Sequence, residues 1–246
     1  MMQLPAEQEP GMIPTKNNTG FMFTELAKLS EQCIEEAAKH GQPVLEMACA
    51  YGVFALPLLE KTQCDLVAAD LSQEHLDILW ARLTPEQQKR TTLAQGKFPH
   101  DFNFAPNSFG AIHISNMLHF LTGKDIMVGL DKCLDWLQPG GKLYLTICSI
   151  NFPLLEDFLP IYQKNRAEGH PWPGELYNLN DYIPEENRKY APDNGFFHVF
   201  STEDIAQCLQ QAGFVDVDAH DFSIGNVIYQ SDKGAWVGAI ASKASK

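Results

Sequence analysis

Short apolar segments alternate with amphipathic segments from Pro43 to Cys148, and this alternation limits the possible folds more than any other feature of the sequence. Apolar runs of four to six residues predict buried strands, and apolar residues at helical spacing predict the helices between them. Strands joined through helices form a mostly parallel sheet that is covered on both faces. The predicted strands are 44–47, 66–69, 91–94, 111–114 and 143–148, and the predicted helices are 53–60, one capped by Ser72, and 124–137.

The segments on either side of this core follow other patterns. Residues 1–19 are polar and proline-containing, which predicts a flexible arm, and 21–40 predict a helix that stops at Gly41. The tetrad 138–141 (Gln-Pro-Gly-Gly) predicts a turn. Residues 149–200 combine prolines with many aromatic residues and predict an insert or lid.

The last part of the chain returns to the pattern of helix and strand. A capping box from Ser201 to Asp204 predicts the start of a helix, and Gly213 its end. Two strands, 214–222 and 235–242, follow without a helix between them, which predicts an antiparallel hairpin at the sheet edge. We therefore divide the chain into an arm and helix (1–40), a core (41–150), an insert (151–200) and a closing helix with a hairpin (201–246).

Charge and cysteine content exclude several classes of function. Acids outnumber bases 31 to 18, giving a net charge of -13, so nucleic acid is a disfavoured partner. The six cysteines include no C-x-x-C pair, which argues against a zinc site and predicts no metal. Scattered thiols favour a reducing, cytoplasmic location. The amino terminus does not resemble a secretory signal, and no apolar run reaches the roughly 18 residues that a membrane span requires.

Two features mark a binding site at the carboxyl ends of the predicted strands, where ligands of such sheets lie. The first is the segment Glu46-Met47-Ala48-Cys49-Ala50-Tyr51-Gly52, whose small residues allow a sharp turn close to a ligand. The second is Asp70, which ends the next strand. An acid in this position can accept both hydroxyl hydrogens of a ribose, as in dinucleotide enzymes.

Together these segments resemble the class I methyltransferases that depend on S-adenosylmethionine (SAM). Residues 44–52 resemble the family's first motif, an acid followed by G-x-G-x-G, with Ala48 and Ala50 in place of two glycines. Asp70-Leu71-Ser72 resembles the second motif. The segments 107–109, 116–119, 137–141 and 212–214 also follow in family order. The resemblance covers about residues 41–150 and 200–242, and each motif is weak alone while the ordered set is specific.

The resemblance implies a Rossmann-like three-layer α/β sandwich with a mostly parallel seven-stranded sheet and an antiparallel last strand. It also implies SAM as cofactor, with S-adenosylhomocysteine as product. The two alanines would crowd the methionine end of SAM unless their backbone angles are ordinary, and the family's acid after strand three is replaced by Gly96-Lys97-Phe98. The cofactor-binding residues that we predict are Glu46, Ala48, Cys49, Ala50, Gly52, Asp70, Leu71, Lys97, Phe98 and Asn116.

Methyl transfer from a sulfonium needs positioning and desolvation, and needs a base only when the acceptor's proton has a high pKa. The candidates for a base are His119, His198 and Tyr51. His119 follows the fourth strand, at the ligand end of the sheet, and His198 ends the insert. A lone histidine is more often structural, and His113 lies mid-strand, where packing is expected.

Three functions remain open from the sequence. The first is methyl transfer to a small organic acceptor, which the aromatic insert favours because aromatic residues can enclose a planar molecule, although they could equally form the insert's own core. A protein acceptor is a variant of this function. The second is an NAD-dependent oxidoreductase, although G-x-G-x-x-G is absent. The third is a non-catalytic module that binds SAM or a partner. The sequence does not fix the oligomeric state.

Overall fold

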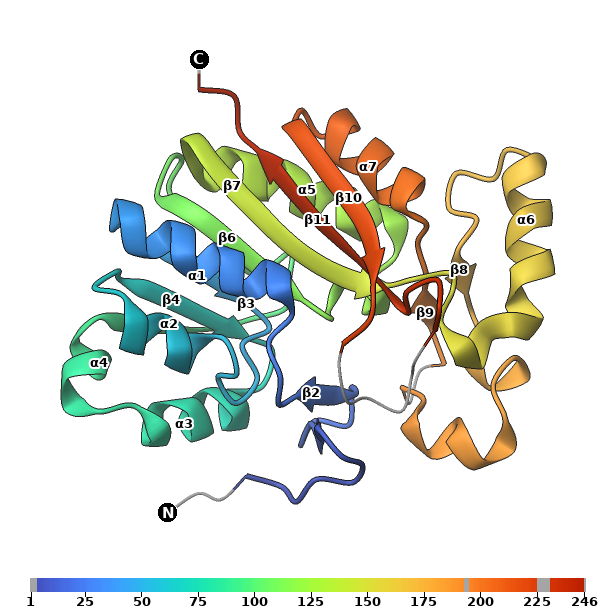
Figure 1. Ribbon diagram of the computed structural model, residues 1–246, viewed down its shortest axis with the longest axis horizontal. Coiled ribbons are helices and arrows are strands. Elements are labelled where there is room, and N and C mark those ends of the chain that lie inside the picture. Colours follow the sequence, from blue (N-terminus) through green and yellow to red (C-terminus); the bar gives the residue numbers. More distant parts are fainter. Residues whose placement is uncertain (1–3, 193–194, 225–230, 246) are drawn as a thin grey trace.

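A seven-stranded mixed sheet forms the centre of the chain (Figure 1). The computed structural model describes residues 4–192, 195–224 and 231–245. The strand order is β10-β11-β7-β6-β3-β4-β5, and the pairings from β7 to β5 are parallel, whereas β11 is antiparallel to both neighbours. This confirms the predicted fold class. The strands are β3 Val44–Met47, β4 Leu66–Asp70, β5 Thr91–Gln95, β6 Phe109–Ser115, β7 Leu137–Cys148, β10 Val215–Phe222 and β11 Trp236–Ser242.

Helices cover both faces of this sheet, as the continuous apolar strands require. Alternate residues of β3 point to opposite sides, so Val44 packs in one core with α1, α2 and α3, while Leu45 packs in the other with α5 and α7. The helices are α1 Lys28–His40, α2 Ala55–Lys61, α3 Gln73–Arg82, α4 Pro85–Lys89, α5 Gly123–Trp136 and α7 Thr202–Gln211. In the described part of the chain, no helix combines the length and apolar character needed to cross a membrane.

The order of the strands reverses between β3 and β6. From β3 the chain moves outward to β4 and β5 on one side, whereas β6 lies on the other side and leads to β7. The segments that follow β3 and β6 therefore lead away in opposite directions and leave a crevice at the carboxyl ends of these strands, which is where open α/β sheets bind ligands.

The amino-terminal prediction was wrong in two respects. The segment expected as a flexible arm forms the strand β1 (Met12–Pro14), which pairs antiparallel with β2 (Phe21–Phe23). The helix predicted over 21–40 begins only at Lys28, because 21–23 are taken into that hairpin. The hairpin lies below the sheet in Figure 1, close to the carboxyl ends of the strands.

The turn predicted at 138–141 was also wrong. This segment is part of β7, which starts directly after α5, and Gly140 is accommodated with a φ of 78°. The pairing of β7 with β6 shifts register between Phe109 and Ala111, so the Pro-Gly-Gly segment is absorbed as an irregularity in the strand. Proline and glycine in a strand are typical of such a position.

The insert has a small core of its own. Forming such a core was one of the two roles considered for its aromatic residues. Phe158 and Tyr162 are buried there with apolar residues from across the insert. Its helical and strand segments are η2 Pro153–Phe158, α6 Leu159–Ala167, β8 Glu175–Leu176, η3 Leu179–Asp181, η4 Glu185–Tyr190 and β9 Phe197–His198. The insert packs beside the sheet edge (Figure 1).

The insert is held to the core at the start of α5. The Gly123 N–H donates to Glu175 Oε1 at 2.8 Å, and a Cβ on Gly123 would lie 1.8 Å from Cδ2 of Trp172. Trp172 can therefore lie on the first turn of α5 only because residue 123 has no side chain.

We expect Gly123→Ala to lower the free energy of unfolding by about 1–2 kcal/mol, because the overpacking penalty exceeds the gain in helix propensity. The melting temperature should fall by about 2–8 °C. The control is the same exchange in a Trp172→Ala background, where the clash is absent and the glycine exchange should have no destabilising effect. An equal loss in both backgrounds would contradict this explanation.

Candidate functional site

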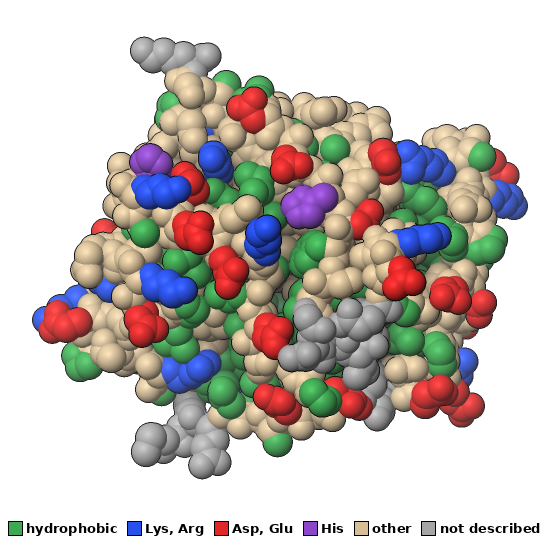
Figure 2. All heavy atoms as spheres, in the orientation of Figure 1, with side chains coloured by type: hydrophobic (Ala, Val, Ile, Leu, Met, Phe, Trp, Pro, Cys, Tyr) green, Lys and Arg blue, Asp and Glu red, His purple; other side chains and the backbone are tan. Residues whose placement is uncertain are grey.

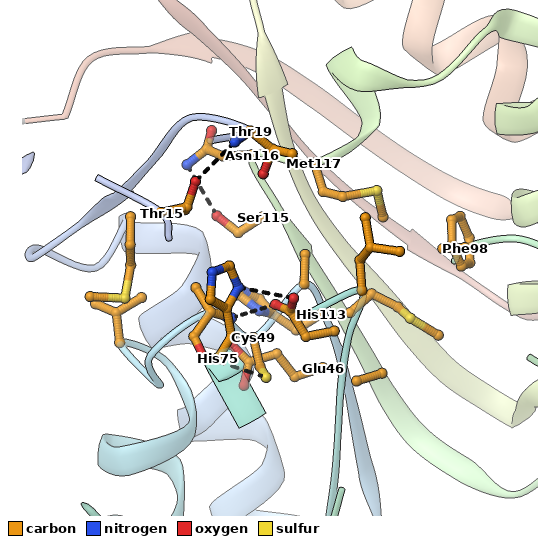
Figure 3. A pocket seen from close by; sticks show the side chains of 18 of the residues that line it. Thr15, Thr19, Glu46, Cys49, His75, Phe98, His113, Ser115, Asn116 and Met117 are labelled. Atoms are coloured by element: carbon orange, nitrogen blue, oxygen red, sulfur yellow. Dashed lines mark hydrogen bonds and ion pairs between the residues drawn. The ribbon is translucent and has the colours of Figure 1, made fainter. Parts of the chain in front are cut away.

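A cavity of about 320 Å³ lies at the carboxyl ends of β3, β4 and β6. This volume is within the usual range for ligand pockets. The turn after β3 and the segment after β6 line one part of it, and the amino-terminal hairpin lines another. In Figure 3, Thr15 and Thr19 of the hairpin lie across the cavity from Glu46 and His75, with Phe98 at the far end. The crevice expected from strand order is thus closed over by the hairpin.

The turn after β3 adopts a left-handed backbone at two alanines. Ala48 has a φ of 58° and Ala50 a φ of 44°, so the condition that both angles be ordinary is not met. The turn is held by Cys49 N–H donating to the Ala69 carbonyl at 3.0 Å and by Ala50 N–H donating to Asp70 Oδ2 at 2.9 Å. The chain therefore keeps the glycine-type turn of the resemblance at a cost in backbone strain.

We expect the double variant Ala48→Gly with Ala50→Gly to be more stable than the native chain. A left-handed L-residue costs about 1–2 kcal/mol, and glycine costs about 0.5–1 kcal/mol in unfolded-chain entropy, so each exchange should gain about 0.5–1 kcal/mol. Thermal unfolding should shift upward by a few degrees, about 2–4 °C per kcal/mol. Ala94→Gly in β5, where no left-handed angle occurs, should instead lower stability. A less stable double variant would refute the strain argument.

Asp70 is the polar centre of the site. Its Oδ1 accepts from Ser72 N–H at 2.9 Å and lies 3.0 Å from His75 Nδ1, while its Oδ2 accepts from Ala50. A carboxylate offers about four acceptor positions, so Oδ2 retains room for one more donor. Asp70 thus fixes the turn and the start of α3, and presents one oxygen to the cavity.

Glu46 and His113 form a second polar pair deeper in the cavity. They are register partners on β3 and β6, and His113 Nε2 lies 2.9 Å from Ser30 Oγ of α1. Glu46 is 2% exposed, and its Oε2 has no hydrogen-bond partner. Burial, and then the charge of Asp70, raise the pKa of Glu46 well above its usual value. The surroundings of this carboxyl therefore favour its neutral form.

The structure brings most of the predicted cofactor-binding residues together. Leu71 is 51% exposed at the cavity, and Lys97 is exposed at its rim, whereas Phe98 is buried. Gly52 does not line the cavity; its φ is 90°, and a Cβ there would lie 2.4 Å from Leu79 Cδ1, so its role is close packing of the turn on α3. The predicted residues that line the cavity are Glu46, Ala48, Cys49, Ala50, Asp70, Leu71, Lys97, Phe98 and Asn116.

The three candidates for a base lie in different places. Tyr51 does not line this cavity: its hydroxyl donates to the Pro14 carbonyl at 3.0 Å and accepts from Lys16 N–H at 2.8 Å, so it ties down the hairpin. His198 is buried in the insert, with Nδ1 3.3 Å from the Leu121 carbonyl. His119 lines a neighbouring cavity and has no partner for Nδ1. The geometry thus places only His119 at a cavity.

Sequence reasoning missed two groups of site residues. His75 pairs with Asp70, and the available signal was its place in the first turn of the helix capped by Ser72, whose Oγ accepts from His75 N–H. His113 was expected to be packed; it stacks on Phe54 with ring centroids 3.8 Å apart, but it also lines the cavity. The hairpin residues Thr15, Asn17 and Thr19 were missed because nothing local indicates that they reach the sheet.

The next two features are the possible metal ligands and the surface charge of the described residues. Among the described residues, no group of three or more His, Cys, Asp and Glu is placed to hold a metal ion. Figure 2 shows acidic and basic side chains interspersed on the face in view, and the described residues there form no continuous basic surface of the kind that nucleic acid requires.

Comparison with known proteins shows what this part of the chain resembles. Residues 44–141 match the family model of a methyltransferase domain, which covers the turn, Asp70 and the segment after β6. Residues 44–141 are therefore similar to a methyltransferase domain. No curated protein sequence matches this chain.

Solved structures show that other proteins share this fold. A SAM-dependent methyltransferase from Methanosarcina mazei gives a TM-score of 0.63 at 16% identity, covering 90% of this chain and 100% of that one. One from Mesorhizobium loti gives 0.62 at 12%, covering 88% and 98%. Phosphoethanolamine N-methyltransferase 2 from Haemonchus contortus, in complex with SAM, gives 0.60 at 15%, covering 89% and 53%. The chain thus spans about half the length of the Haemonchus protein.

Proposed function

We propose that this protein transfers a methyl group from SAM to a small organic acceptor. The observation that carries the proposal is the position of Asp70, which meets the left-handed turn after β3 at one cavity and keeps a free acceptor position on Oδ2. An oxygen there suits a ribose hydroxyl.

The residues present fit SAM. The volume of about 320 Å³ suits a nucleoside with an amino-acid chain, and the unpartnered Oε2 of Glu46 is a buried group that lacks a donor. Asp70 would bind a ribose hydroxyl, Leu71 would pack on the adenine, and Glu46 would meet the ammonium group. When bound, SAM supplies an electrophilic methyl group on a positively charged sulfur.

The chain's own residues would hold the reactants in position and exclude water from the cavity. The hairpin carries Phe21, Met22 and Phe23 over the cavity, where they exclude water. Tyr51 keeps the hairpin closed through Pro14 and Lys16, and the Lys16 Nζ–Glu74 Oε1 ion pair of 2.5 Å adds a second tie. Since displacement at a sulfonium mainly requires alignment, these contacts are sufficient without a strong base.

The hairpin and the insert cover part of the site, which favours a small acceptor over a protein. The Haemonchus relative has been solved with phosphomonomethylethanolamine and S-adenosylhomocysteine, which supports small acceptors on this fold. The six cysteines are all buried and unpaired, which supports a reducing, cytoplasmic location. A non-catalytic SAM-binding module remains the alternative, since the strained turn at Ala48 and Ala50 could lower affinity.

The test is calorimetric titration with SAM, S-adenosylhomocysteine and NADH. We expect micromolar binding of the first two and none of NADH, with at least tenfold weaker binding in Asp70→Asn. The matched control is Asp65→Asn, which changes an exposed acid at the other end of the same strand.

Each other outcome has a definite meaning. Binding of NADH alone would replace methyl transfer with a redox function. Binding of SAM without turnover in a screen of small acceptors would favour the non-catalytic module. An equal effect of both aspartate variants would show that Asp70 is not a ligand.

A further inference from the structure

A second cavity, of about 110 Å³, adjoins the first. Four residues line both cavities, so the two meet at the segment after β6 and the hairpin; they are Phe21, Phe23, Asn116 and Phe120. The remaining walls come from the insert, from Cys148 at the end of β7 and from Trp236 at the start of β11. This cavity is thus built where hairpin, core and insert converge.

Aromatic rings from the hairpin, the core and the insert form part of the wall. Trp236 meets Phe23 and Phe152 edge-on, with ring centroids 5.4 and 5.8 Å apart. On another side, Phe197 lies 4.9 Å from His119 and 5.9 Å from Phe120. Aromatic rings in such mutual contact present a fixed apolar surface that suits a planar guest.

The polar groups of this cavity are few and uncharged. Its described lining includes no Asp, Glu, Lys or Arg; the side chains with polar nitrogen or oxygen are Asn116, His119, Asn187 and Trp236. Asn116 Oδ1 and His119 Nδ1 are both buried without a hydrogen-bond partner. Burial, and then His198, lower the pKa of His119 to about 3, so its ring is neutral at physiological pH. A charged guest would lose its hydration here and find no counter-charge among these residues.

We infer that this second cavity binds the methyl acceptor, and that the acceptor presents an uncharged single ring bearing a hydroxyl or amine that hydrogen-bonds to Asn116 and His119. The inference rests on the proposed function, since the first cavity is then occupied by SAM. The volume of about 110 Å³ limits the guest to a single ring, because an apolar cavity of about 150 Å³ holds benzene and this one is smaller. Asn116 is at the junction of the cavities, where the accepting atom must lie.

The experiment measures binding of four probes to the full-length protein saturated with S-adenosylhomocysteine. The probes are phenol, toluene, benzoate and phenyltrimethylammonium, and calorimetry reports their affinity. We expect phenol to bind most tightly, toluene more weakly, and the two ions at least tenfold more weakly than phenol. Asn116→Gly should weaken phenol about 3- to 10-fold and leave toluene unchanged, since it removes one hydrogen bond. Glycine is the suitable replacement because Asn116 has a φ of 52°.

Asn107→Gly is the matched control, because Asn107 has a φ of 57° but lies on neither cavity. Tightest binding of the ammonium probe would overturn the neutral class in favour of recognition by cation–π contacts. Tightest binding of benzoate, or no binding of any probe, would overturn the assignment of the cavity. If S-adenosylhomocysteine itself does not bind, the proposed function is wrong. The selectivity of the native protein among the four probes, measured in the absence of S-adenosylhomocysteine, then still tests the assignment of the cavity.

Discussion

Lowering the pH from 7 to 5 is expected to remove about 6 kcal/mol of the free energy of unfolding through three buried histidines. Burial lowers the pKa of His113 and of His119 from 6.5 to about 3, and that of His198 to about 4, where Glu175 partly opposes the effect. All three rings are uncharged in the fold, and each would have to be desolvated to carry a proton there.

The direction follows from the two states. A histidine whose pKa is lower in the folded chain than in the unfolded one contributes stability above the unfolded value of 6.5. As the pH falls below 6.5, the unfolded chain takes up protons that the folded chain refuses, and each histidine costs about 1.4 kcal/mol per pH unit down to its folded pKa. Since domains are stable by about 5–15 kcal/mol, the histidines remove a large fraction of the free energy of unfolding while the carboxylates are still mostly ionised.

The measurement is the free energy of unfolding in urea at pH 5 to 8. In each of the variants His113→Gln, His119→Gln and His198→Gln, the slope of the free energy of unfolding against pH should decrease. The decrease should correspond to about one proton fewer taken up on unfolding. His40→Gln, at the exposed end of α1, is the matched control and should leave the slope unchanged. A slope that is the same in all four variants would show that these rings do not limit stability in acid.

The core of this fold could be predicted from the sequence because its determinants are local. The buried strands are short apolar runs, Ser72 caps α3 through His75 N–H, and Asp70 falls at the end of β4 as the pattern required. These features depend on residues within a few positions of each other. The cavity-lining residues of the turn after β3 were identified for the same reason.

The amino-terminal hairpin and the second cavity could not be predicted, because they depend on contacts between residues that are distant in the sequence. The hairpin is fixed by Tyr51 and Glu74, which lie far along the chain from Lys16, and its strands have only three residues each. No periodicity can be detected over three residues. Tyr51 is therefore a candidate base from the sequence, whereas in the structure its hydroxyl holds the hairpin, and the sequence does not predict the second cavity because three separate segments form it.

Glu46→Gln is expected to stabilise the protein at neutral pH, in the opposite direction to the acid effect. The pKa of Glu46 is raised in the fold by burial and by Asp70, so the unfolded chain releases this proton above about pH 4.5 while the folded chain keeps it. Stability is therefore present at low pH and lost as the pH rises, by about 1.4 kcal/mol per unit up to the folded pKa. Glu46 thus offsets at most about 3 kcal/mol of the histidine effect between pH 7 and 5.

Glutamine is neutral in both states and removes this loss. At pH 7.5 the variant should gain at most about 4 kcal/mol over the native chain, and the gain should vanish near pH 4.5. Urea unfolding at the two pH values measures this, with Glu60→Gln on the exposed side of α2 as the matched control. A variant that is less stable at pH 7.5 would show that the carboxyl is ionised and satisfied in the fold.

Glu46→Gln should also bind SAM more weakly. A role in binding would explain why a side chain that destabilises the fold stands in this position. The positive charge of the ammonium group of SAM would stabilise the carboxylate form of Glu46, so that Glu46 loses its proton to the solvent and binding should release up to one proton. Calorimetry in two buffers of different ionisation enthalpy measures this release, which should disappear in Glu46→Gln together with at least tenfold in affinity. Unchanged affinity in a more stable variant would place the ammonium group elsewhere in the cavity. Loss of both the proton release and the affinity would show that Glu46 lowers the stability of the fold and contributes to SAM binding.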